Sequence, residues 1–116
     1  MSYMCSSTLL NKITNEVANN IYEILGDKLK KVILYGSYAR GDYDNESDID
    51  IMVLADVTDT ELPKLRDKIC HISSDVSLKN NITVSIFIKD LTFFNNHINV
   101  LPFYNNVMKE GVTIYG

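Results

Sequence analysis

The stretch Lys31–Leu54, KVILYGSYARGDYDNESDIDIMVL, decides the fold. It begins with an apolar run, Val32–Tyr35, that ends at a Gly-Ser pair, and it closes with a second apolar run, Asp48–Leu54, that carries two aspartates. Short runs of β-branched and apolar residues bounded by turn residues predict strands. We therefore expect two strands joined by a polar loop, the second of them ending near Ala55.

The second strand carries Asp48 and Asp50 two positions apart. Alternate residues of a strand point to the same face, so the two carboxylates should project together at roughly 7 Å. At an effective dielectric constant near 20 their repulsion costs about 2 kcal/mol. A divalent cation removes that cost, and Mg²⁺ held by one or two carboxylates plus substrate phosphates fits the pattern. The alternative, in which both aspartates face water on an edge strand, stays open at this stage.

The Gly-Ser pair, Gly36 and Ser37, follows the first strand. Glycine lets the backbone turn sharply, and Ser37 is expected to cap a short helix, Tyr38–Arg40. The N-terminus of a helix attracts anions. A phosphate cradle next to two metal ligands predicts a nucleoside triphosphate site, whereas the Gly-Ser pair alone would be compatible with an ordinary turn.

The pattern of Gly36-Ser37, ten residues and then Asp48-x-Asp50 resembles the signature of the nucleotidyltransferase superfamily related to DNA polymerase β. The fuller strings, GSYARG at 36–41 and SDID at 47–50, resemble the minimal nucleotidyltransferase (MNT) branch. The resemblance implies an α/β (α+β) fold, the small nucleotidyltransferase fold, with a short mixed β-sheet and helices packed on it. We expect a single nucleotidyltransferase domain over residues 1–116.

The resemblance also implies roles for particular residues. It makes Asp48 and Asp50 the catalytic and metal-binding residues, and it gives nucleotide contacts to Gly36, Ser37, Arg40 and Ser47. Arg40 either anchors the loop or approaches a phosphate, and both readings stay open. Ser47 is expected to shape the entry into the second strand.

The third strand departs from the family pattern. A third carboxylate is expected there, but Ile82–Phe87 contains neither Asp nor Glu. Its position should be taken by Thr83 or Ser85, whose hydroxyl groups are poor Mg²⁺ ligands and poor bases. Asp75 or Asp90 could substitute, although each lies outside the strand. The departure puts the rate of catalysis in question more than it does nucleotide binding.

Two functions follow from the resemblance. The first is an enzyme that uses Mg²⁺ to move AMP, or another nucleoside monophosphate, from ATP or another nucleoside triphosphate to a hydroxyl. The acceptor would be a Tyr on a HEPN-domain ribonuclease toxin, which makes the chain an antitoxin. The second is a catalytically weak or inactive module that binds nucleotide and neutralises its partner by complex formation.

The rest of the chain supplies elements to pack on these strands. Amphipathic periodicity and start and stop residues predict the helices Leu9–Leu25, Thr60–Leu78, Leu91–His97 and Pro102–Glu110, and the strands Ile82–Ile88 and Val112–Tyr115. Met1–Thr8 is expected to be loose.

Composition and net charge limit the kinds of partner that the chain is expected to bind. The chain has 116 residues and a net charge of −4, and no long basic run, which argues against electrostatic capture of nucleic acid. Its apolar content of 46% and charged content of 22% are ordinary for a globular protein. Neither a signal peptide nor a membrane span is recognisable, so a cytoplasmic location is expected, and the oligomeric state stays open.

Several reactive side chains have plainer interpretations. Cys5 and Cys70 show neither metal-ligand spacing nor a disulfide framework and are expected to be reduced thiols. His71 and His97 are expected at helix surfaces or boundaries. Phe93 and Phe94 are expected to pack and not to stack on a nucleotide.

Overall fold

The helices and strands follow one another along the chain in the order that the sequence predicts. The computed structural model describes residues 7–44 and 47–116. Its helices are α1 (Ser7–Leu25), α2 (Ser37–Arg40), α3 (Leu62–Asn80), α4 (Leu91–His97) and α5 (Pro102–Glu110), with a 3-10 turn, η1 (Gly26–Lys28), after α1. Its strands are β1 (Leu29–Tyr35), β2 (Ile49–Ala55), β3 (Val84–Asp90) and β4 (Val112–Tyr115).

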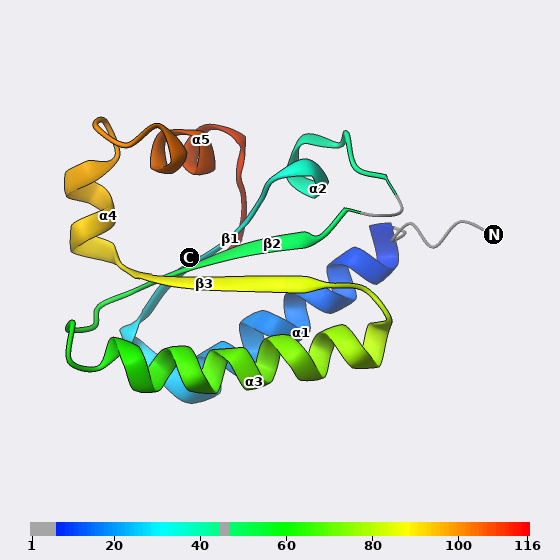
Figure 1. The fold of residues 1–116 in the computed structure, drawn as a ribbon, viewed down its shortest axis with the longest axis horizontal. Coiled ribbons are helices and arrows are strands. Elements are labelled where there is room, and N and C mark those ends of the chain that lie inside the picture. The colour runs from blue at the N-terminus through cyan, green and yellow to red at the C-terminus, as the bar shows by residue number, and fades with distance from the viewer. Residues whose placement is uncertain (1–6, 45–46) are drawn as a thin grey trace.

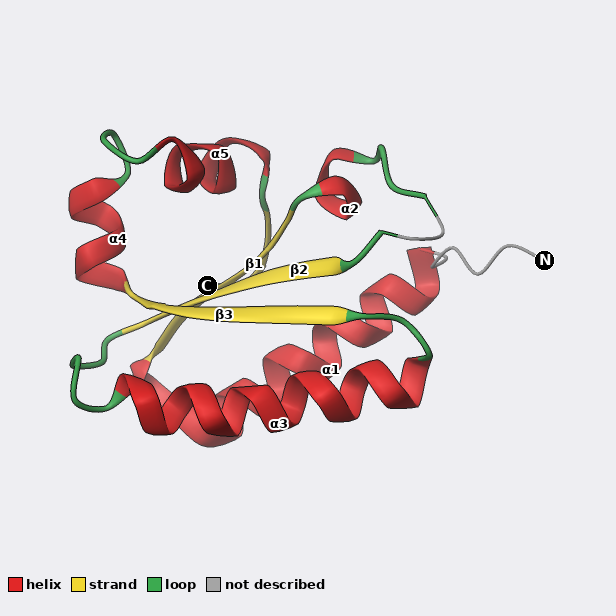
Figure 2. Ribbon diagram, viewed as in Figure 1, coloured by secondary structure: helices red, strands yellow, loops and turns green. Residues whose placement is uncertain are grey.

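The four strands form one mixed sheet in the order β3-β2-β1-β4. β1 is antiparallel to β2 and to β4, whereas β2 and β3 are parallel. Helices α1 and α3 cover one face of the sheet, and α4 and α5 lie on the other (Figure 1). Figure 2 shows α2 beside the end of the sheet where β2 begins, α4 toward the opposite end, and α5 between them. The mixed α/β architecture agrees with the predicted fold class.

Two apolar clusters hold the layers together. The larger one lies between the sheet and the helices α1 and α3, and it includes the fully buried side chains Ile13, Ile21, Ile51, Val53 and Val76. The smaller one lies under α4 and α5 and consists of Ile33, Met52, Leu54, Phe94, Tyr104 and Val107. Burial of each large aliphatic side chain contributes about 1.5–3 kcal/mol. The odd-numbered residues of β2 belong to the larger cluster and so face α1 and α3, whereas the even-numbered residues face the side that carries Asp50.

β2 lies in the interior of the sheet. It pairs with β1 on one side and β3 on the other, and this excludes the interpretation of Asp48 and Asp50 as residues of an edge strand. Because β1 runs antiparallel, its C-terminal end meets the beginning of β2. The pairing places the turn after Tyr35 next to Asp50.

The structure corrects several predicted boundaries. Ser7 and Thr8 belong to α1, while residues 1–6, including Cys5, lie outside the described residues. Helix α3 begins at Leu62 and not at Thr60, since the carbonyl of Thr58 accepts hydrogen bonds from Glu61 and Leu62 in a preceding turn.

The third strand lies two residues later than predicted. Asn81 adopts a left-handed conformation that ends α3, so β3 starts at Val84. At its other end, Lys89 and Asp90 continue the pairing with β2. Helix α4, helix α5 and strand β4 have the predicted bounds.

Candidate active site

Gly36 forms the turn between β1 and α2 and is closely packed against Asp50. Its backbone has φ 76° and ψ −157°, a conformation that residues with a Cβ rarely adopt. A Cβ built at Gly36 would lie 2.5 Å from Oδ2 of Asp50. Glycine is thus required here for its backbone angles and for the room that the carboxylate occupies.

Ser37 is the first residue of α2, and Gly36 is the N-cap residue. The prediction that Ser37 caps the helix with its side chain is wrong, because the sharp turn at Gly36 brings Ser37 itself into helical geometry. The carbonyl of Gly36 accepts hydrogen bonds from Ala39 and Arg40 at 3.1 Å each. As the first residue of a helix, Ser37 has no intrahelical acceptor for its N–H group. Both its N–H and its hydroxyl therefore lie at the end of α2 that adjoins Asp50.

Asp50 is the second residue of β2 and is half-buried, whereas Asp48, predicted as the first residue of this strand, lies one position before it and is exposed. Burial raises the pKa of the Asp50 carboxyl, and the nearby charge of Asp48 raises it further, while Arg40 lowers it. The two carboxylates therefore repel each other. A cation between them would relieve both causes of the raised pKa.

The neighbours of Asp50 in the sheet are Tyr35 and Ser85. Asp50 is paired with Tyr35 of β1 on one side and with Ser85 of β3 on the other. Adjacent strands are about 4.8 Å apart, and paired residues project to the same face. Burial, and then the charge of Asp50, raise the pKa of the Tyr35 hydroxyl, so Tyr35 is a neutral hydrogen-bond donor at the site.

The two candidates for the third-carboxylate position, Thr83 and Ser85, lie differently relative to Asp50. Ser85 lies directly beside Asp50, whereas Thr83 precedes β3, and its carbonyl accepts a hydrogen bond from the Ile49 N–H at 2.9 Å. Asp75 cannot substitute, because it lies on α3, where it forms an ion pair with Lys79. Asp90 lies at the far end of β3, where its side chain accepts a hydrogen bond from Phe93 N–H.

Arg40, in the segment between β1 and β2, links that segment to α5. Its guanidinium group forms ion pairs with Asp42 and Glu110, each at 3.3 Å. Both pairs are largely exposed and contribute little to stability on their own. The charge of Arg40 also lowers the pKa of the Asp50 carboxyl.

Ser47 shapes the loop before β2. Its hydroxyl accepts a hydrogen bond from the Asp44 N–H at 3.0 Å and lies 3.3 Å from Oδ1 of Asp44, and its own N–H donates to the Asp44 carbonyl at 3.2 Å. Ser47 immediately precedes Asp48, so these hydrogen bonds hold the backbone just before the first aspartate. Residues 45 and 46, between Asp44 and Ser47, are outside the described residues.

An open hollow lies on the Asp50 side of the sheet. Its volume is about 470 Å³, and it is lined by Tyr35, Met52, Phe87, Lys89, Leu101, Pro102, Phe103 and Tyr104. Met52 and Phe87 are the residues two positions beyond Asp50 and Ser85, so the hollow begins one step along the strands from the carboxylates. A smaller hollow of about 220 Å³ joins Tyr35, Gly36 and Arg40 to α5. Typical small-ligand sites have volumes of about 300–1,000 Å³.

Tyr35, Phe87 and Phe103 were missed by sequence reasoning as residues of the site. Phe103 comes from α5, and its ring lies edge-on to that of Tyr35 with centroids 5.6 Å apart. Tyr35 could have been found from the sequence, because an antiparallel strand that ends at Gly36 must place its last residue beside the start of the next strand. No signal in the sequence indicates that α5 returns to this point.

The remaining candidates lie away from the carboxylates. His71 is exposed on α3, on the opposite side of the sheet, and Cys70 is a free, exposed thiol on the same helix. His97 stacks on Phe93 with ring centroids 4.0 Å apart. Phe94 is fully buried, as predicted, whereas Phe93 is half-exposed.

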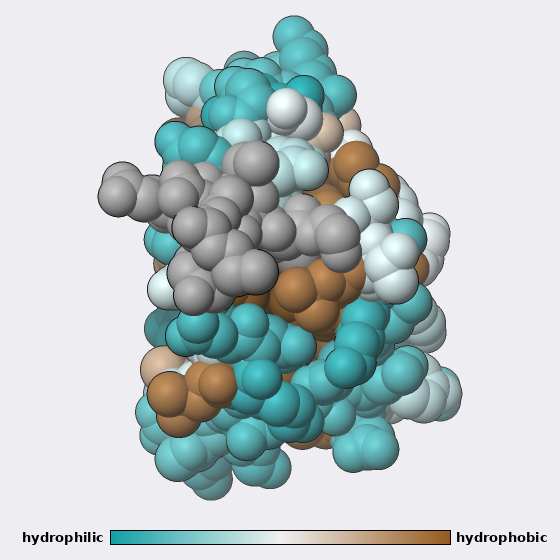
Figure 3. All heavy atoms as spheres, turned by 90° about the vertical axis from the view of Figure 1, so that its right-hand side faces the viewer, coloured by the Kyte–Doolittle hydropathy of each residue, from teal (hydrophilic) through white to brown (hydrophobic). Residues whose placement is uncertain are grey.

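The side of the molecule where β2 begins has a mainly polar surface (Figure 3), whereas the hollow of about 470 Å³ is lined largely by apolar and aromatic side chains. The side of the molecule viewed in Figure 3 is mainly hydrophilic, with hydrophobic side chains in small separate patches. Within residues 7–44 and 47–116, no three His, Cys, Asp or Glu side chains gather where they could hold a metal. None of the described helices is long and apolar enough to span a membrane.

The fold and the site together define a nucleotidyltransferase. The family model described as polymerase beta nucleotidyltransferase matches residues 11–116, and the chain belongs to that family. A relative from Methanocaldococcus jannaschii, MJ0141, is named as a candidate protein adenylyltransferase. It is 43% identical over 95 residues, which are 80% of this chain and 92% of the relative.

Solved structures share the fold. A toxin-antitoxin structure with AMP-PNP has a TM-score of 0.54 and 20% identity, and the match covers 89% of this chain and 73% of that chain. A tri-AMPylated HEPN toxin of Shewanella oneidensis in complex with MNT antitoxin contains a match with a TM-score of 0.50 and 16% identity, over 91% of this chain and 72% of that chain. These similarities agree with the predicted MNT resemblance at the level of the fold.

Proposed function

We propose that the protein transfers AMP from ATP to a protein hydroxyl in a Mg²⁺-dependent reaction. The observation that carries the proposal is the packing of the Gly36 turn against Asp50, where a Cβ would lie 2.5 Å from Oδ2. This contact joins a phosphate-binding turn to a carboxylate pair in one site. Neither half has an evident structural use alone, because the pair repels itself and the turn adopts a glycine-only conformation.

The residues fit a Mg²⁺ ion. Asp48, just before β2, and Asp50 within it offer oxygen ligands, and burial and then the charge of Asp48 raise the pKa of Asp50. Mg²⁺ is commonly bound by one or two carboxylates, with water and substrate phosphates completing its octahedron. When bound, the ion would neutralise charge on the triphosphate and activate the attacking hydroxyl.

The chain's own groups then orient the nucleotide. The N–H and hydroxyl of Ser37 would hold the β- and γ-phosphates at the start of α2, with Arg40 nearby. The α-phosphate would lie over Asp48 and Asp50. The nucleoside would extend into the hollow of about 470 Å³, where Phe87 and Phe103 offer apolar and aromatic surfaces.

The reaction is an in-line substitution at the α-phosphorus. The acceptor hydroxyl oxygen forms a bond to that atom, and the bond from it to the bridging oxygen of the β-phosphate breaks. Pyrophosphate leaves with the electrons of the broken bond, and the hydroxyl proton passes to water. Gly36 and Ser37 keep the leaving group in line throughout.

We assign the acceptor role to a tyrosine on a HEPN-type toxin, with this chain as the antitoxin. Support comes from the name of the S. oneidensis complex, an AMPylated HEPN toxin with its MNT antitoxin, and from the name of the M. jannaschii relative. The reduced thiol of Cys70 and the use of ATP suit the cytoplasm as the compartment. Nucleic acid is not expected as a direct ligand, given the net charge of −4.

The test is transfer of label from α-labelled ATP to a HEPN-type partner protein in the presence of Mg²⁺. We expect transfer by the natural chain and at least about a hundredfold less by the Asp48→Asn, Asp50→Asn double variant. Asp56→Asn removes an exposed carboxylate just after β2 and is the matched control. Transfer that persists in the double variant contradicts the assignment of the two aspartates.

The register of β3 favours a second candidate function. Ser85 lies where the family pattern expects a carboxylate beside Asp50. A serine hydroxyl is a poor Mg²⁺ ligand, so the chain could bind Mg·ATP with little turnover and neutralise its partner by forming a complex. Nucleotide binding without label transfer, combined with inhibition of the partner, would distinguish this function from the first.

A further inference from the structure

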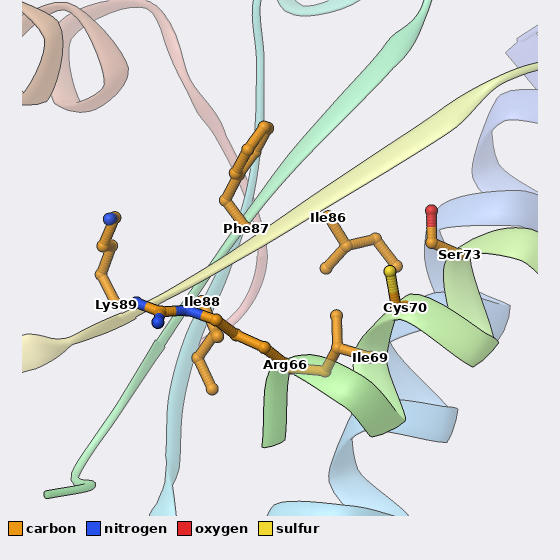
Figure 4. A pocket seen from close by; sticks show the side chains of 8 residues that line it. All are labelled: Arg66, Ile69, Cys70, Ser73, Ile86, Phe87, Ile88 and Lys89. Carbon is orange, nitrogen blue, oxygen red and sulfur yellow. The ribbon is translucent and has the colours of Figure 1, made fainter. Parts of the chain in front are cut away.

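We propose that the outer edge of β3 is a docking site for an extended, acidic segment of a partner protein, which adds to the sheet as a further strand. The site is formed by the backbone of β3 and by a groove between β3 and α3. The groove has a volume of about 240 Å³ and is lined by Arg66, Ile69, Cys70, Ser73, Ile86, Phe87, Ile88 and Lys89 (Figure 4). Phe87 and Lys89 also line the hollow of about 470 Å³, but the groove lies between β3 and α3, and the inference does not depend on nucleotide transfer.

The backbone of β3 alternates between its partner strand and the open edge. The Thr83 carbonyl points toward β2, where it accepts the Ile49 N–H. In a parallel strand the N–H and C=O of one residue point to the same side, and the next residue points to the other. Val84, Ile86 and Ile88 therefore direct their backbone groups away from β2. β3 is an edge strand, so these groups meet no further strand of the sheet.

Of these three residues, only Val84 has both of its outward-facing backbone groups hydrogen-bonded to described side chains of the chain itself. The N–H of Val84 donates to the Ser77 hydroxyl at 2.9 Å, and the Val84 carbonyl accepts a hydrogen bond from the Ser73 hydroxyl. No described side chain provides the same for Ile86 or Ile88. The two serines thus close the beginning of the edge, and the stretch from Ile86 onward is left for pairing. An edge of this kind is a template for strand addition.

The side chains around the open stretch select the partner's charge. Arg66 extends from α3 along the groove, whereas Lys89 projects with Phe87 from β3 to the opposite face of the sheet (Figure 4). Neither cation forms an ion pair with a described carboxylate, although the chain has a net charge of −4. The groove itself is largely apolar, with Ile69 and Ile86 among its lining residues. Adjacent residues of an added strand point to opposite faces, so a segment with two neighbouring acidic side chains among apolar ones can meet both cations.

A second copy of this chain fits less well. Two β3 strands that paired about a twofold axis would have to use the stretch from Ile86 to Asp90, because Val84 is already satisfied. That pairing would bring the Arg66 and Lys89 cations of both copies together. Like charges at such a distance are destabilising. The charge pattern therefore favours a different, acidic chain over self-association.

The test uses the full chain labelled with ¹⁵N and a short fluorescent peptide of valines around a central pair of adjacent glutamates, compared with the same peptide carrying lysine in place of glutamate. We expect the glutamate peptide alone to bind when fluorescence anisotropy is followed up to millimolar concentration. Its binding should protect the Ile86 and Ile88 amides from hydrogen exchange. Equal binding of both peptides, absence of binding, or protection elsewhere would overturn the proposal.

Variants identify the cations. Arg66→Gln and Lys89→Gln should each weaken binding of the glutamate peptide about two- to fivefold, the range of an exposed ion pair. Lys68→Gln removes an exposed charge from the same helix outside the groove and should leave the affinity unchanged. Equal effects of all three variants would indicate general charge attraction and contradict the site. A dimer without peptide that protects Ile86 and Ile88 would instead assign the edge to a second copy.

Discussion

The Cα of Gly36 lies against the carboxylate of Asp50, so that any Cβ at position 36 would stand 2.5 Å from Oδ2. This contact ties the end of β1 and the start of α2 to the second aspartate of β2. It also leaves Asp50 half-buried, which is the main cause of its raised pKa. The loop geometry and the charge of the site are thus parts of one arrangement.

Replacing Gly36 with alanine should damage the nucleotide site more than the fold. The left-handed backbone costs a residue with a Cβ about 1–2 kcal/mol, and the new methyl group must also displace the Asp50 carboxylate. We expect the affinity for Mg·ATP to fall by at least about tenfold, equivalent to about 1.4 kcal/mol. Calorimetric titration measures that loss.

Gly41→Ala is the matched control for this prediction. Gly41 also has positive φ, 84°, but no atom lies within 4 Å of a Cβ built there. This variant should lose a similar amount of stability, about 1 kcal/mol, and keep its nucleotide affinity. If both alanine variants lose affinity equally, strain in the loop accounts for the effect and contact with Asp50 does not.

Asp50→Asn should stabilise the folded protein at neutral pH. Because the pKa of Asp50 is raised, the folded chain holds this proton more tightly than the unfolded chain. Its contribution to stability is therefore present below the unfolded pKa and is lost as the pH rises through the folded pKa. At roughly 7 Å in a water-like dielectric, removing the repulsion from Asp48 is worth on the order of 0.6 kcal/mol.

We expect Asp50→Asn to raise the melting temperature at pH 7 by about 2–5 °C without Mg²⁺. The difference from the natural chain should disappear toward about pH 3, where both forms are neutral at this position. Thermal unfolding at the two pH values measures it. A lower melting temperature of the variant at pH 7 would mean that the carboxylate makes a favourable contact in the absence of metal.

The prediction that Asp48 and Asp50 share a face rests on strand alternation, which is a local property. Because β2 begins at Ile49, Asp48 lies just before the strand, and the shared face stays a prediction. The pairing partner of Asp50 on β3 is different, since the choice between Thr83 and Ser85 depends on where α3 ends and the strand begins. That boundary is set by Asn81 in its left-handed conformation, and sequence patterns locate such boundaries poorly.

Ser85→Asp should convert a weak site into a stronger one. Ser85 is paired with Asp50, so the new carboxylate would join the other two on one face. We expect Mg²⁺ affinity and AMP transfer to rise by about tenfold or more, and stability without Mg²⁺ to fall by about 1 kcal/mol from added repulsion. Label transfer and thermal unfolding with and without Mg²⁺ measure the two effects.

Ser74→Asp provides the control, because Ser74 is exposed on α3 and remote from the carboxylates. It adds the same charge and should change neither Mg²⁺ affinity nor transfer. A Ser85→Asp variant with no gain in either quantity would show that Ser85 is not the position of the third ligand.

The two possible roles of Arg40 can be distinguished by comparing single substitutions of Arg40 and of its partner Glu110. Arg40→Gln removes the guanidinium group, whereas Glu110→Gln breaks one of its ion pairs and leaves the cation in place. If Arg40 approaches a phosphate, Arg40→Gln should weaken Mg·ATP binding by about tenfold and Glu110→Gln should not. Equal and small effects of both variants, below about 1 kcal/mol, would assign Arg40 to anchoring the loop.

The parts of the site that depend on how α5 folds back over the sheet could not be predicted from the sequence. Phe103 reaches Tyr35 only because α5 folds back over the sheet, and neither residue lies near the other in sequence. The role of Ser37 was also misjudged, since the sharp turn at Gly36 is a backbone property that residue type alone does not fix. The local half of the site was therefore predictable, and the half built by tertiary packing was not.

Calorimetric titration of ATP into the natural chain and into the Asp48→Asn, Asp50→Asn variant tests the central claim most directly. With Mg²⁺ present, we predict saturable binding by the natural chain and binding at least about tenfold weaker by the variant. With the metal removed by EDTA, the order should reverse or vanish, because the carboxylates then repel the triphosphate. Equal Mg·ATP affinity of the two proteins would contradict the claim that this carboxylate pair holds the metal-nucleotide.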